Sequence, residues 1–128
     1  WVVLDDLAMP QPQSVELRFH TYGQVKRNGA TWTIEDDGAA LALIPLGEGL
    51  AGATQTPDGW IKPVTVLSLK SQQDSAAFSI PTVIYPLLGG EAPPVTFDRS
   101  ENELRIVVGG DPTLFRLTPA GWQIAGAE

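Results

Sequence analysis

Three polar residues at alternate positions, Arg18, His20 and Tyr22, form the arrangement in this sequence best suited to chemistry. Alternate side chains of a β-strand share one face, and Tyr22 joins that face only if the strand continues past His20. A histidine or tyrosine there could remove a proton beside a carboxylate while the arginine neutralises the carboxylate. The same alternation is typical of a polar sheet face turned to solvent or to another domain. We favour this second interpretation and predict no catalytic residue.

Metal and cofactor sites have little support in the sequence. The chain has one histidine and no cysteine, and acidic pairs such as Asp36-Asp37 fall where turns are expected. The run 47–52 resembles a dinucleotide-binding glycine motif but lacks the strand and helix that must flank such a motif, so it is interpreted as a flexible loop. We predict neither a metal nor a cofactor.

Tryptophan side chains are the other candidates for ligand contact, because indole rings stack on sugar rings. Trp32 alternates with Ile34, and Trp122 alternates with Ile124, so both tryptophans are predicted to point inward. Trp60 follows an Asp-Gly pair and remains the candidate for sugar stacking.

The net charge restricts the partners of the chain. Eight basic and fifteen acidic residues give a formal charge of −7, which repels nucleic acid, anionic lipid and acidic polysaccharide. An anionic ligand would therefore need a local basic patch. The apolar runs are far shorter than the roughly 20 residues that span a bilayer, so no membrane or nucleic-acid partner is predicted. The lack of cysteine fits several compartments.

Glycine and proline punctuate the chain at spacings typical of all-β proteins, with 13 glycines and 11 prolines spread through it. Strands are predicted at Trp1–Leu4, Val15–His20, Thr31–Glu35, Ala39–Leu43, Val64–Lys70, Ala76–Tyr85, Val95–Asp98, Glu103–Val108, Leu114–Leu117 and Trp122–Ile124. The Asp36-Asp37-Gly38 segment predicts a hairpin turn. Pro81 inside a predicted strand indicates a bulge, an edge position or a strand in two pieces.

These elements predict an antiparallel two-sheet β-sandwich of about ten strands with little or no helix. Residues 1–128 are expected to form a single domain, with the segment 89–94 as a long connecting loop. Because the chain opens directly in a strand-like run, we expect it to be a fragment of a larger protein.

Three segments, Trp1–Leu7, Val15–Thr21 and Pro81–Pro86, resemble the C-terminal β-domain of heparinase II/III-like polysaccharide lyases in order and spacing. The resemblance implies a periplasmic or secreted parent, with a helical toroid followed by a sandwich, that cleaves uronate-containing polysaccharides such as alginate by β-elimination. In that family the catalytic Asn, Tyr and first His lie in the helical part, and a His-x-His motif upstream of this segment supplies another His.

This sequence has no His-x-His motif. Its His20 matches a later Phe-His-Thr position of the family pattern, to which the resemblance assigns no catalytic role. The resemblance therefore implies a non-catalytic accessory domain. Its partners would be the helical catalytic domain of the same parent chain and, through the parent, an acidic polysaccharide. The alternative is an independent carbohydrate-binding β-sandwich module. The sequence leaves open which polysaccharide is involved, endo or exo action, the oligomeric state, and whether His20 faces solvent, a domain interface or a ligand.

Overall fold

The computed structural model describes residues 1–47, 49–59 and 61–126, which form strands and turns with no helix among them. The prediction of an all-β fold is confirmed. The chain divides into two compact units, Trp1–Gly90 and Glu91–Glu128. That residues 1–128 form one domain stays a prediction. In the described part of the chain, no helix has the length and hydropathy needed to cross a bilayer.

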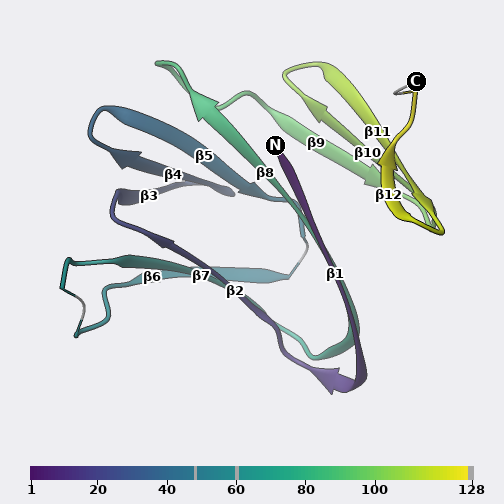
Figure 1. Ribbon diagram of the computed structural model, residues 1–128, viewed down its shortest axis with the longest axis horizontal. Coiled ribbons are helices and arrows are strands. Elements are labelled where there is room, and N and C mark those ends of the chain that lie inside the picture. The colour runs from purple at the N-terminus through teal and green to yellow at the C-terminus, as the bar shows by residue number, and fades with distance from the viewer. Residues whose placement is uncertain (48, 60, 127–128) are drawn as a thin grey trace. The chain divides into compact units, whose positions relative to one another are not determined.

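The first unit contains two antiparallel sheets (Figure 1). The five-stranded sheet has the order β1 (Val2–Gln13), β8 (Ser75–Leu87), β5 (Ala39–Pro45), β4 (Thr31–Asp36) and β3 (Gln24–Asn28). The three-stranded sheet has the order β2 (Glu16–Thr21), β7 (Thr65–Ser71) and β6 (Leu50–Gln55). The chain passes between the two sheets several times, first from β1 to β2 and then from β2 to β3.

A shared apolar core joins the two sheets face to face as a β-sandwich. Its buried members come from both sheets and are Trp32, Leu43, Leu67 and Leu69. Leu17 and Phe19 of β2 pack against this cluster, as their alternation with polar residues predicts. Each fully buried leucine contributes about 1.5–3 kcal/mol relative to an exposed one, so this cluster is a main source of the stability of the sandwich.

The hairpin between β4 and β5 forms at the predicted Asp-Gly turn. Asp37 and Gly38 have φ of 48° and 80°, so both lie in the left-handed region. Two successive left-handed residues match the twist of the flanking strands, which is why Asp-Gly and Asn-Gly pairs are frequent in such turns. The turn fixes the register in which Asp36 pairs with Ala39.

Two strands were not predicted, which raises the number among the described residues from about ten to twelve. β3 is largely polar, and β6 contains a glycine and small residues instead of an apolar alternation. The interpretation of the run 47–52 as a flexible loop is partly wrong, because β6 begins at Leu50. Both are edge strands, so pairing on a single side and a few inward side chains suffice to hold them.

The expectation for Pro81 was wrong. β8 is one continuous strand between β1 and β5, and Pro81 lies fully buried within it. The Pro81 carbonyl accepts a hydrogen bond of 2.8 Å from the Leu46 amide, just after β5 ends at Pro45. The N and C=O of a strand residue face the same neighbour, so the ring nitrogen also points to the end of β5. The lack of an N–H group at Pro81 therefore affects only the last position of the hydrogen-bond ladder between β5 and β8.

The second unit contains an antiparallel meander, in which strands that follow each other in the chain are neighbours in the sheet. Its strands are β9 (Val95–Arg99), β10 (Glu103–Val108), β11 (Asp111–Thr118) and β12 (Gly121–Ile124). One face carries the buried side chains of Leu104 and Ile106. The opposite face is charged, with an ion pair of 2.9 Å between Arg116 and Glu103. Hydrophobic alternation along β10 predicts this two-sided character.

Trp32 is buried, as predicted, whereas Trp122 is only partly buried. Trp122 lies on β12, an edge strand of the second unit, where neighbours cover it on one side. Its ring centroid lies 5.2 Å from the Arg99 guanidinium carbon, a distance typical of a cation–π contact. Ile124 on the same face is 55% exposed, so this end of the strand is less covered than the alternation predicts.

Candidate functional surface on the three-stranded sheet

Arg18 and His20 lie on the outer face of the three-stranded sheet, opposite the core. Both side chains are exposed, while Leu17 and Phe19 point into the sandwich. Arg18 pairs across the sheet with Ser68, and His20 pairs with Val66. The two residues therefore share the face that the sequence predicts for them.

The Arg18 guanidinium is engaged within its own strand. It lies 3.1 Å from the Glu16 carboxylate, which also accepts a hydrogen bond from the Ser68 hydroxyl. The Ser68 hydrogen bond, followed by that of Arg18, holds the pKa of Glu16 below its usual value. Lys70 lies opposite Glu16 across the strands and adds attraction to the ionised carboxylate. Glu16 thus partly neutralises both cations of this face.

Tyr22 does not continue the face of Arg18 and His20. β2 ends at Thr21, whose hydroxyl accepts a hydrogen bond of 2.9 Å from the Gly23 amide, and this local bond turns the chain. Gly23 lies so close to β4 that a Cβ there would be 2.6 Å from the Glu35 carbonyl oxygen. The condition that the strand extends to Tyr22 is therefore not met.

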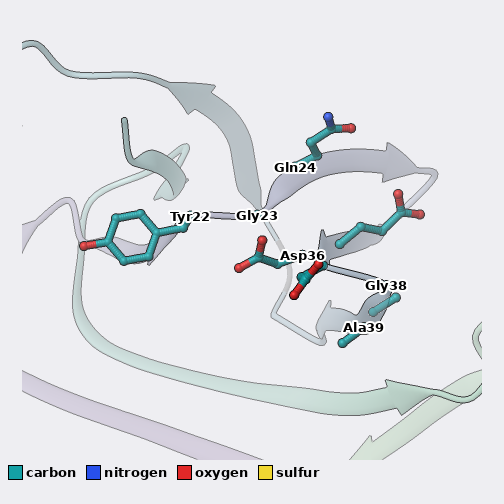
Figure 2. Close-up of a pocket in the computed structure, with 9 residues that line it drawn as sticks. Tyr22, Gly23, Gln24, Asp36, Gly38 and Ala39 are labelled. Carbon is teal, nitrogen blue, oxygen red and sulfur yellow. The ribbon is translucent and has the colours of Figure 1, made fainter. Parts of the chain in front are cut away.

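The Tyr22 ring is 56% exposed, and the Lys62 ammonium lies 4.5 Å from its centroid. Tyr22 borders an open hollow of about 520 Å³, and Figure 2 shows its ring extending away from Gln24 and Ala39. The remaining lining residues belong to the turns around β3, β4 and β5 and are Gly23, Glu35, Asp36, Asp37, Gly38 and Ala40. The acidic lining follows from the hairpin turn described above.

A second open hollow, of about 440 Å³, lies where β7 turns into β8. Its polar lining is supplied mainly by Gln72, Gln73, Asp74 and Ser75, with Phe78 and Ala77 beside them. Ser71 at its border ties this turn to the start of β2, because its hydroxyl accepts a hydrogen bond of 3.0 Å from the Val15 amide. Ser71, at the border of this hollow, therefore links the end of β7 to the start of β2.

The candidate residues do not form an acid–base arrangement. Arg18 forms an ion pair with Glu16. Tyr22 lies beyond the end of β2, where its ring contacts the Lys62 ammonium. Of the three candidates, only Arg18 and His20 share a face. Within the described ranges, no group of three or more His, Cys, Asp or Glu side chains could hold a metal. Trp60, the candidate for sugar stacking, lies outside the described residues.

The sequence patterns did not predict the side-chain hydrogen bonds that join neighbouring strands on their polar faces. Ser68 binds Glu16, and Ser79 in β8 donates a hydrogen bond to Asp6 in β1. Each link joins residues more than 50 positions apart, so only the strand pairing brings them together. Comparisons with protein-family models, curated proteins and solved structures returned no significant match.

Proposed function

We propose that this chain is a non-catalytic accessory β-domain of a heparinase II/III-like polysaccharide lyase, in which it braces the sandwich and its contact with a helical catalytic domain. The parent enzyme would cleave a uronate-containing polysaccharide by β-elimination in the periplasm or outside the cell. The helical domain of the same parent chain would be the direct partner, and the acidic polysaccharide would be bound through the parent.

One observation carries this proposal: in β2 and β8, several of the residues behind the resemblance to the lyase family lie in the core. Phe19 packs against the central cluster, and Pro81, Thr82 and Val83 are buried in β8, the central strand between β1 and β5. Motifs made of such residues specify a scaffold, because their side chains are not available to a substrate. The outward His20 beside them belongs to a face whose arginine is already paired.

The lyase assay tests the non-catalytic role. Purified chain is mixed with alginate, heparin or hyaluronan, and absorbance near 235 nm is followed, where the unsaturated product of elimination absorbs. We expect no increase above the rate without protein. A sustained increase that disappears in His20→Ala would overturn the proposal and identify His20 as a catalytic residue.

Independent carbohydrate binding by this chain, as a β-sandwich module, is the alternative function. Arg18 and Lys70 supply cations to the outer face of the three-stranded sheet, although the chain as a whole is negative. Retardation of the chain in a native gel containing alginate would support this alternative, particularly if Arg18→Ala together with Lys70→Ala abolished it. Retardation that is lost in Trp60→Ala would support sugar stacking by that residue, whereas unchanged mobility of the wild-type chain would favour the accessory role alone.

A further inference from the structure

Strand β1 forms one edge of the five-stranded sheet, and among the described strands it pairs with β8 alone. From Val2 to Ala8 the pairing with β8 is regular, and its register shifts only after Ala8. Figure 1 shows β1 running along β8 through this stretch. The first half of β1 therefore presents an edge of seven residues without a register shift.

Hydrogen bonding at the N-terminus shows which backbone groups face the open side. The Trp1 nitrogen and carbonyl exchange hydrogen bonds of 2.8 Å with Ile84, so Trp1 and Ile84 form a hydrogen-bonded pair. In an antiparallel ladder such pairs alternate with pairs that are not hydrogen-bonded. Val3, Asp5 and Leu7 therefore bind β8, whereas the N–H and C=O groups of the even-numbered residues 2, 4, 6 and 8 point outward.

Prolines and a register shift, two of the usual protections of an edge strand, are absent from the first half of β1. Prolines at positions 10 and 12 and the register shift lie in the second half of the strand. The opposite edge of the sheet, β3, is only five residues long and carries Lys26 and Arg27. In the first half of β1, by contrast, Val3 and Leu7 are each 39% exposed, and Trp1 before it is 79% exposed.

Charge selects the kind of strand that fits this edge. Asp5 and Asp6 are the charged residues of the segment from Val2 to Ala8, and they lie at its centre on opposite faces of the sheet. Asp6 also accepts a hydrogen bond from the Ser79 hydroxyl of β8. Opposite charges that face each other across strands are favourable, and like charges are unfavourable. Two copies of the edge paired antiparallel over the full segment would place Asp5 opposite Asp5, which disfavours self-pairing.

We propose that the edge from Val2 to Ala8 accepts an additional β-strand from a partner polypeptide that has two consecutive basic residues between apolar or β-branched ones. The basic pair would face Asp5 and Asp6, one on each side of the sheet, and the main chain of the partner would bind the outward groups of the even-numbered residues. The inference extends the proposed accessory role, because it names the surface through which such a domain would join a larger assembly.

Amide hydrogen exchange with a defined peptide tests the inference. The probe is Thr-Val-Thr-Lys-Arg-Thr-Val-Thr with blocked ends, added to the whole chain and followed by NMR. We expect exchange to slow at least about tenfold at Val2, Leu4, Asp6 and Ala8, whose amides face the edge. The amides of residues 3, 5 and 7 already bind β8 and should change little, so the alternation is specific to strand addition.

Two controls separate backbone pairing from charge attraction. The same peptide methylated on the alternate nitrogens that face β1 should give no protection, because it cannot donate to the edge. The Asp5→Asn and Asp6→Asn double variant keeps side-chain size and the potential to bind Ser79, and should bind the basic peptide about two- to thirtyfold more weakly. A Glu-Glu version of the peptide should bind the wild-type chain more weakly still.

Several outcomes would overturn the inference. The first is slow exchange of the even-numbered amides in the free chain, and the second is protection that grows with protein concentration alone. The others are equal binding of the Glu-Glu and basic peptides, and no protection at a millimolar concentration of the basic peptide. The first would mean that the edge is already covered, and the second that another copy occupies it. None of these outcomes changes the lyase assay, so failure of the edge inference remains distinguishable from failure of the accessory role.

Discussion

The indole ring of Trp32, in the five-stranded sheet, lies directly against the backbone of Gly52 in the three-stranded sheet. A Cβ at position 52 would overlap Cζ2 of Trp32 and would also lie 3.2 Å from Cδ2 of Leu69. Glycine in a strand commonly marks such a close approach. The absence of a side chain at Gly52 therefore allows the largest core residue to fit between the sheets.

Gly52→Ala is expected to lower the free energy of unfolding by about 1–3 kcal/mol, the usual cost of adding a methyl group to a packed core. Urea unfolding followed by tryptophan fluorescence measures the change. A double variant that also carries Trp32→Phe should lose less stability than the sum of the two single variants, because the smaller ring leaves room for the methyl group. Additive losses would show that the two residues do not contact each other in solution.

Thr82 is fully buried in β8, and its hydroxyl has no hydrogen-bond partner among the described residues. Thr82→Val preserves the shape of the side chain and removes this hydroxyl, so we expect the free energy of unfolding to rise by about 1–3 kcal/mol. Thermal or urea unfolding measures the change. As a matched control, Thr82→Ser keeps the hydroxyl and loses a methyl group, and should destabilise the chain by about 1 kcal/mol. A less stable valine variant would indicate that the hydroxyl binds an ordered water.

Glu16 should titrate below the usual range for glutamate, because the Ser68 hydroxyl and then Arg18 stabilise its charged form. We expect Ser68→Ala to raise the pKa of Glu16, as measured by NMR titration of its side-chain carboxyl carbon. Because the folded pKa is lowered, the contribution of Glu16 to stability is present above its unfolded pKa and disappears as the pH falls through the folded value. An unchanged pKa in Ser68→Ala would contradict the hydrogen bond.

Much of the fold follows from local patterns. The alternation from Val15 to His20 predicts both the strand and its buried face, and Asp37-Gly38 predicts the hairpin between β4 and β5. These signals are local because a side chain alternates with its immediate neighbours and a turn needs particular φ values. The ten predicted strand segments all lie on or within strands of the structure, apart from residues at their ends.

The candidate site was less predictable. Alternation places Arg18 and His20 on one face, but the ion pair that occupies Arg18 also involves Ser68, which is 52 positions away from Glu16. Tyr22 was assigned to the same face conditionally, and the condition fails because Gly23 is held against the Glu35 carbonyl of another strand. Neither contact leaves a pattern in the neighbouring sequence.

The sequence by itself determined the all-β class, the inward side of the well-patterned strands and the position of the sharpest turn, since each depends on residues adjacent in the chain. Only the tertiary structure decided the order of the strands, the central place of Pro81 and the edge position of β1. The physical reason is that backbone hydrogen bonds between strands are nearly independent of side-chain identity. Which strands become neighbours is therefore settled by long-range packing such as that of Trp32 on Gly52.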